Sequence, residues 1–165
     1  MSKMAELVGA SRQSRANART LLDGALKASS DVIALAKDLF AIVSVLDSSA
    51  ALRRALTDPS RASADKSALV SGLLGSKFSA AAGELVAKLA EMRWSGPSDL
   101  ADVLEQLAIE AEASAANVAG ELDRLEDELF ALSRIIASNG QLRQSLSSQQ
   151  FPLAARQELV VSLSK

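Results

Sequence analysis

Residues 39–75 and 129–165 carry the same pattern twice, ninety positions apart, and this repeat constrains the fold more than any other feature of the chain. Without a gap, 11 of the 37 aligned positions are identical. The retained residues are mainly Leu, Phe, Val and Ala at helical spacing, so the repeated feature is a packing surface. No metal ligand or general base recurs at the matched positions. A duplicated helical scaffold of this kind is typical of a binding or structural protein.

Composition places the chain in the all-α class. Of its 165 residues 48% are apolar, mainly Ala and Leu, which are strong helix formers, and only three prolines and eight glycines interrupt them. The expected architecture is a six-helix bundle in residues 1–119, joined by one long helix to a partial second copy in residues 120–165 that repeats residues 30–75. A β-sheet core anywhere in residues 1–138 would contradict this prediction.

Breaks in the apolar pattern set the expected helix limits. Asp31 has the residue type that caps a helix start, and Gly75 has the type that ends one. The prolines of Asp58-Pro59 and Gly96-Pro97 prevent continuation. The final long helix is expected to continue through Gly120. The predicted helices cover about residues 4–27, 31–48, 50–57, 62–75, 79–94 and 99–137.

The absence of Cys and His excludes several kinds of site. It removes disulfides, thiolate catalysis and the commonest zinc ligands, and it leaves acid–base chemistry to shifted carboxylates or lysines. The rival class is a helical hydrolase or transferase that uses carboxylates such as Asp99, Asp102 and Glu105. Acids spaced in this way without histidine make a poor metal site and instead favour the positive start of a helix. We therefore expect no enzymatic activity, no metal and no cofactor.

Hydropathy and charge bound the location and the partners. No stretch approaches the roughly 20 apolar residues that span a bilayer, and the amino end lacks a signal-peptide pattern. We expect a cytoplasmic chain without direct membrane insertion. Residues 99–128 hold ten acidic groups against Arg124 alone. This segment is either a solvated helix face or an acidic face that selects a basic partner and repels nucleic acid.

Two further features have alternative interpretations. Arg53 and Arg54 could clamp a phosphate or carboxylate, or could lie on a solvated helix face. Trp94, the single tryptophan, could anchor an interface or close one end of the bundle.

The order of these elements resembles one known family. A helix leading into Leu52-Arg53-Arg54-Ala55-Leu56-Thr57-Asp58-Pro59, then a short helix ending at Leu73-Leu74-Gly75, is similar to the delta subunit of F-type ATP synthases, the oligomycin-sensitivity-conferring protein family. Residues 78–89, then Arg93-Trp94 and a helix start at Asp99-Leu100, look like its fifth and sixth helices. Some bacterial members carry a duplicated bundle, which would explain the repeat. The family's first helix usually carries a Tyr, which Ala10-Ser11-Arg12-Gln13-Ser14 lacks.

The resemblance implies a non-catalytic role in ATP synthesis and hydrogen ion transport. The family's subunit links the catalytic head to the peripheral stalk at the inner face of the cell membrane, and so acts as part of the stator. It binds N-terminal helices of alpha subunits in a groove between its first and fifth helices. The residues that match this groove are Leu7, Ala10, Ser14, Ala18, Leu21, Ala82, Leu85, Val86 and Leu89. Ala18→Glu would weaken that docking, or would lower stability if Ala18 packs inside the bundle.

Other partners follow from the same reasoning. The family contacts the b subunit through a C-terminal α/β segment that has no counterpart in residues 1–165, which are either a fragment or a natural short form.

The second copy lacks the helix that follows the first copy, so residues 139–165 are expected to exchange amide hydrogens faster than the first copy does. Self-association through Leu142, Leu146, Leu159 and Leu163 is a further expectation. The alternative function is a helical-repeat adaptor that binds an amphipathic helix of a different partner.

Overall fold

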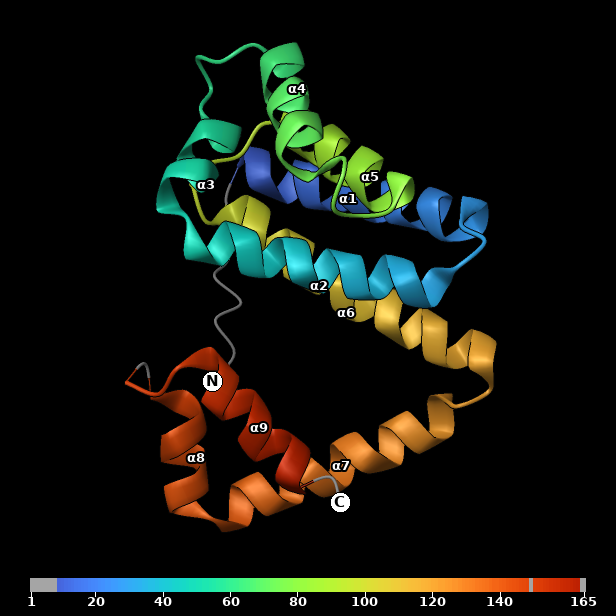
Figure 1. Cartoon of the computed structure of the whole chain (residues 1–165), viewed down its shortest axis with the longest axis vertical. Helices are drawn as coiled ribbons and strands as arrows, with labels where there is room; N and C mark the ends of the chain where they lie inside the picture. The colour runs from blue at the N-terminus through green and yellow to red at the C-terminus, as the bar shows by residue number, and fades with distance from the viewer. Residues whose placement is uncertain (1–8, 149, 164–165) are drawn as a thin grey trace. The chain divides into compact units, whose positions relative to one another are not determined.

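The computed structural model describes residues 9–148 and 150–163 and divides into two compact units, Met1–Ala115 and Ala116–Lys165. Within these described residues there are nine α-helices and no strand (Figure 1). The predicted all-α class is therefore confirmed. None of the helices in these ranges combines the length and the hydrophobicity that a membrane span requires.

The first unit contains the first six helices. They are α1 (Ala10–Ala28), α2 (Val32–Ser48), α3 (Ala50–Thr57), α4 (Ser63–Leu74), α5 (Ala80–Glu91) and α6 (Asp99–Ala119), whose last residues pass into the second unit. Side chains cap three of the helix starts. Asp31 accepts a hydrogen bond from the Ala34 N–H, Ser49 from the Leu52 N–H, and Ser79 from the Ala82 N–H. These caps satisfy backbone donors that a helix start leaves unpaired.

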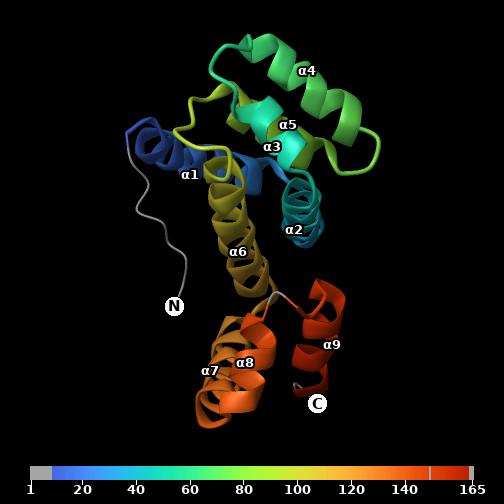
Figure 2. The ribbon, with the colours of Figure 1, turned by 90° about the vertical axis from the view of Figure 1, so that its left-hand side faces the viewer.

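The core of the first unit forms around α5. This helix contacts α1, α2, α3 and α4, and Figures 1 and 2 both show it between α1 and α4. Apolar residues of α2 and α6 recur at helical spacing, and their side chains are almost completely buried. They include Leu35, Leu39, Ile42, Leu46, Leu100, Leu104 and Leu107. These residues are the side of each helix that meets the core.

The second unit consists of three helices that begin ninety residues after α2, α3 and α4. They are α7 (Leu122–Ser138), α8 (Gly140–Ser147) and α9 (Leu153–Leu163). The cap also recurs, because Asn139 accepts from the Leu142 N–H as Ser49 accepts from the Leu52 N–H. In both copies the serine that ends the first helix donates to a carbonyl three residues earlier, from Ser48 to Val45 and from Ser138 to Ile135. The local structure is therefore repeated as well as the sequence.

The prediction of one continuous helix over residues 99–137 is wrong, because the chain breaks at Gly120. Gly120 has φ +71°, which is favourable for glycine and costly for other residues. The Glu121 N–H donates to the Ala116 carbonyl at 2.8 Å, and the Gly120 N–H donates to the Asn117 carbonyl at 3.1 Å. This pair of bonds is the Schellman arrangement that ends a helix. α6 and α7 are consequently two helices.

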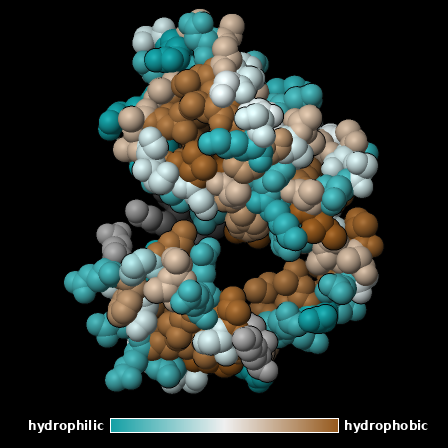
Figure 3. All heavy atoms as spheres, viewed as in Figure 1, coloured by the Kyte–Doolittle hydropathy of each residue, from teal (hydrophilic) through white to brown (hydrophobic). Residues whose placement is uncertain are grey.

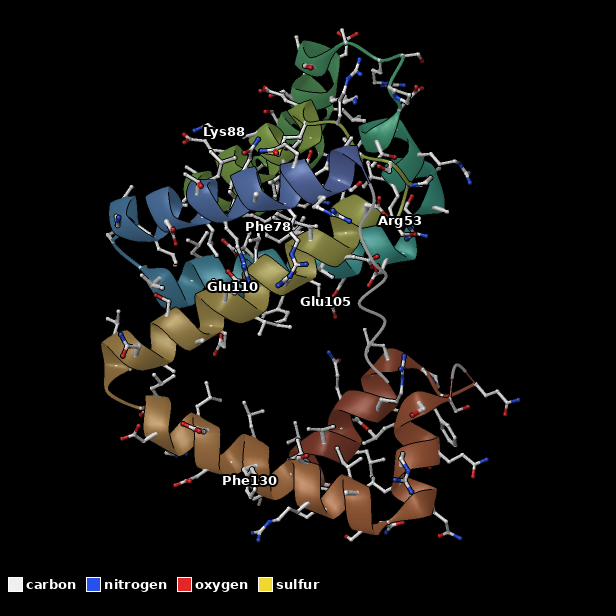
Figure 4. All side chains as sticks on the ribbon, turned by 180° about the vertical axis from the view of Figure 1, so that it is seen from behind. Arg53, Phe78, Lys88, Glu105, Glu110 and Phe130 are labelled. Atoms are coloured by element: carbon white, nitrogen blue, oxygen red, sulfur yellow. The ribbon has the colours of Figure 1, made fainter. Side chains whose placement is uncertain are left out.

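The second unit buries few of its apolar side chains. Among its described residues Leu142 is the single buried hydrophobic, and α7 and α9 contain no buried residue. Brown surfaces in the lower part of Figure 3 show hydrophobic side chains gathered on this unit. Phe130, labelled on α7 in Figure 4, is 66% exposed.

Candidate functional site: an apolar groove between α1 and α5

Helices α1 and α5 contact each other. They correspond to the two helices between which the family resemblance implies a binding groove. Most of the residues assigned to that groove nevertheless face the core. Ser14, Ala18, Ala82, Leu85, Val86 and Leu89 are buried. Leu21 is half-buried, Ala10 is exposed, and Leu7 lies outside the described residues. Because Ala18 is completely buried, we expect Ala18→Glu to lower stability, the second of its two expected outcomes.

An open groove lies beside this buried face and is walled by the same two helices. Its volume is about 350 Å³. Its lining residues are Thr20, Leu21, Gly24, Ala25 and Ala28 from α1 and Ala81, Glu84, Leu85 and Lys88 from α5. Of the predicted set, Leu21 and Leu85 line this groove.

The residue types in the groove suit a helical ligand. Leu21, Ala25 and Leu85 provide apolar surface, and Gly24, Ala28 and Ala81 are small enough to allow close approach of a second backbone. No heavy atom lies within 4 Å of the position that a Gly24 Cβ would occupy, so this side of α1 is open. Glu84 and Lys88, the latter labelled in Figure 4, supply polar groups to the lining. An apolar floor with polar flanks is the pattern by which an amphipathic helix is bound.

Polar contacts hold α1 in place beside this groove. Ser11, which is completely buried, accepts a hydrogen bond from the Ser95 N–H at 2.7 Å and donates to Asp99 Oδ2 at 2.5 Å. Ser14 donates to the Arg93 carbonyl at 2.6 Å. These bonds explain why the serines of α1 are buried. They fix the first half of α1 against the segment between α5 and α6.

Farther along α1, the Arg19 guanidinium forms an ion pair with Glu110 of α6 (Glu110 is labelled in Figure 4). Arg19 is one of the arginines of α1, and this contact fixes the middle of the helix to α6. The ion pair also raises the pKa of Arg19, mainly through its hydrogen bond to Glu110.

Of the three residues with alternative interpretations, Arg54 is exposed on α3, whereas Arg53 and Trp94 have structural roles in the first unit. Arg53 donates to the carbonyls of Leu46 and Asp47 at 2.6 and 2.9 Å, and so satisfies acceptors at the end of α2. The Trp94 side chain is 6% exposed, and its indole N–H donates to the Leu89 carbonyl at 2.9 Å. Trp94 therefore closes the end of α5 as part of the core.

The carboxylates at the start of α6 have structural surroundings in the first unit. Asp99 accepts the hydrogen bond from Ser11, and Asp99 and Asp102 lie in the first turn of α6, where negative charge favours the helix dipole. Burial raises the pKa of Glu105, and the nearby charges of Asp47 and Asp102 raise it further. Across the described residues no group of three acidic side chains is placed to hold a metal ion.

The fold and the groove define a class, that of all-α proteins with an open groove between two helices of a bundle. Within that class, the family model for the ATP synthase delta (OSCP) subunit matches residues 14–113, which include nearly all of α1 and the whole of α2 to α5. The chain belongs to this family.

Individual relatives agree with the family assignment. The ATP synthase subunit delta of Streptomyces avermitilis is 45% identical over 156 residues, which cover 94% of this chain and 57% of that protein. The ATP synthase subunit delta of Beutenbergia cavernae is 46% identical over 129 residues, which cover 78% of this chain and 48% of that protein. That of Kineococcus radiotolerans is 43% identical over 156 residues, which cover 94% of this chain and 56% of that protein. The chain thus spans about half the length of these relatives.

Proposed function

We propose that the chain is a non-catalytic stator component of an F-type ATP synthase, which links the catalytic head to the peripheral stalk. Membership of the delta (OSCP) family supports this role. The observation that carries the proposal is the open groove of about 350 Å³ between α1 and α5. In this role the chain works at the inner face of the cell membrane, as a peripheral part of the complex.

The proposed ligand of the groove is the amphipathic N-terminal helix of an alpha subunit. Its apolar side chains would lie on Leu21, Ala25 and Leu85, while Glu84 and Lys88 would meet its polar flanks. Gly24 and Ala81 would let the two backbones approach closely. Contact with the b subunit belongs to the same proposal and would involve the longer protein. The acidic excess of residues 99–128 supports a protein partner and disfavours nucleic acid.

The second unit extends the proposal. We infer that α7, α8 and α9 are a partial second copy of the bundle, because their limits repeat those of α2, α3 and α4 at an interval of ninety residues. The chain would then be a long form of the subunit with a duplicated helical bundle. This origin accounts for the identical positions in residues 39–75 and 129–165.

Gly24→Gln tests the groove without damage to the core. The substitution replaces a helical glycine with a stronger helix former, so stability should hold or rise, while the new side chain enters open space in the groove. We expect a labelled alpha-subunit N-terminal peptide to bind the variant at least tenfold more weakly in a fluorescence-anisotropy titration. The matched control is Gly72→Gln on α4, also an exposed helical glycine with open space around it, which should bind as the wild type does.

The two outcomes that contradict this assignment are distinct. Equal binding by both variants would place the peptide elsewhere on the chain. Absence of binding to the wild type at moderate salt would remove the alpha-subunit helix as the ligand, and a helical adaptor with a different partner would then be the better reading. Isolation of the chain from native extract together with alpha and beta subunits would exclude that adaptor.

A further inference from the structure

The second unit exposes the apolar positions that the first unit buries. Five core residues of α2 and α3 are at most 1% exposed, and each has an apolar counterpart ninety positions later. The pairs are Leu35 and Leu125, Leu39 and Leu129, Ile42 and Leu132, Leu46 and Ile136, and Leu56 and Leu146. All five counterparts are at least partly exposed, and Leu129 is 57% exposed. The second unit therefore has the apolar surface that forms the core of the first unit, but no described helix of the same unit covers that surface.

The first unit shows which element covers that surface. There α5 packs against α2, α3 and α4 and buries Leu85, Val86 and Leu89 in the shared core. The contact reaches the start of α4, where Ser63 Oγ donates to the carbonyl of Glu91, the last residue of α5. Within the second unit no described helix occupies the corresponding place, because α7, α8 and α9 correspond to α2, α3 and α4.

We propose that the apolar face of α7, α8 and α9 is a docking site for one amphipathic helix with the chemistry of α5. Such a helix carries leucine or valine at i, i+1 and i+4, as Leu85, Val86 and Leu89 do, with small residues such as alanine elsewhere on the same helix. The proposal concerns a surface of the second unit and does not depend on what binds between α1 and α5.

Arg156 gives independent support for this occupant. It lies on α9, at the position that Lys66 has on α4. Its Nη1 donates to the Leu146 carbonyl of α8 at 3.4 Å, whereas its Nε–H is buried and has no acceptor within the described residues. Buried donors are nearly always paired. In the first unit the last carbonyl groups of α5 lie next to the start of α4, so a helix seated in the same way on α9 brings acceptors to this region.

The chain itself supplies the probe that tests the docking site. A labelled peptide of residues 78–93 is titrated into the full chain and followed by fluorescence anisotropy. Because the first unit already holds its own α5 on the same polypeptide, the added peptide is expected to bind the second unit. A peptide with Leu85, Val86 and Leu89 replaced by Ser should not bind.

Substitutions then locate the bound peptide. Leu129→Asp should weaken its binding at least tenfold. Ile109→Asp, which changes an equally exposed apolar residue on α6, should leave binding unchanged. Unaltered binding to the Leu129→Asp variant would overturn the proposal, and so would absence of binding to the wild type.

Self-association is the competing occupant and is measured in the same samples by sedimentation equilibrium. A dimer that Leu129→Asp abolishes, and that a saturating amount of the peptide does not dissociate, would assign the face to a second copy of the chain and overturn the proposal. A monomeric chain, or a dimer that the peptide dissociates, supports the proposal. Of the leucines expected to mediate self-association, Leu142 is buried within its own unit.

Discussion

Ser11→Ala removes the contact that fixes the start of α1 to the rest of the first unit. In the wild type the completely buried Ser11 hydroxyl accepts from the Ser95 N–H and donates to the Asp99 carboxylate. Alanine retains the helix and removes both bonds. The loss of a hydrogen bond to a charged group costs about 1.5–3 kcal/mol, and the loss of a neutral one about 1 kcal/mol. We therefore expect the free energy of unfolding to fall by about 2–4 kcal/mol.

Ser14→Ala provides the matched comparison. Ser14 is also a buried serine on α1, but its hydroxyl donates to a neutral acceptor, the Arg93 carbonyl, at 2.6 Å. Its loss should cost about 1 kcal/mol. Urea denaturation followed by Trp94 fluorescence measures both variants, because this single tryptophan is buried in the first unit and reports on its unfolding.

A double-mutant cycle completes the test. If Ser11 and Asp99 stabilise each other, the cost of Asp99→Ala should fall by at least about 1 kcal/mol in the Ser11→Ala background. Purely additive costs would refute the assigned contact. An equal loss of stability for Ser11→Ala and Ser14→Ala would show that the charge of Asp99 contributes nothing through Ser11.

The remaining predictions concern two glycines and one acid. Gly24→Ala should stabilise the first unit by up to about 1 kcal/mol, since Gly24 is helical with open space at its Cβ position. Gly120→Ala should destabilise the end of α6 by about 1 kcal/mol because φ is +71° there. Urea denaturation followed by circular dichroism measures the stability of both glycine variants. Burial and the nearby charges of Asp47 and Asp102 raise the pKa of Glu105 above the ordinary glutamate value near 4.5. Ionisation of Glu105 therefore opposes folding as the pH rises above that value. Glu105→Gln should therefore raise the urea midpoint at pH 7, and this gain should disappear at pH 4.

Local signals in the sequence were sufficient to predict most of the helices. Asp31 caps α2 as expected, and the serine and glycine breaks near residues 49 and 139 fall between helices. These features depend on residues within one or two turns of each other. Gly120 was misjudged because a glycine inside an apolar helical pattern can either be tolerated or end the helix, and composition does not separate the two.

The side of α1 that faces the groove was hard to predict for a different reason. The face of α1 consists largely of serine and alanine, which are found both in cores and on surfaces, so hydropathy could not orient the helix. Ser11 and Ser14 face inward because of partners about 80 residues away in the chain. The small residues Gly24, Ala25 and Ala28 were the available signal for the open side. Whether this groove binds an alpha-subunit helix stays a prediction.

The polar contacts of α1 also have a consequence for the order in which the chain folds. Ser11 is bonded to groups 84 and 88 residues later, and Arg19 is paired with a group 91 residues later. During synthesis α1 is the first helix of its unit to leave the ribosome, yet none of these partners exists until the residues after α5 have been made. The contacts of α2, α3 and α4 close much shorter loops and can form earlier. α1, the earliest helix of its unit to be made, is thus expected to complete its polar contacts only after α5 and part of α6 have been made.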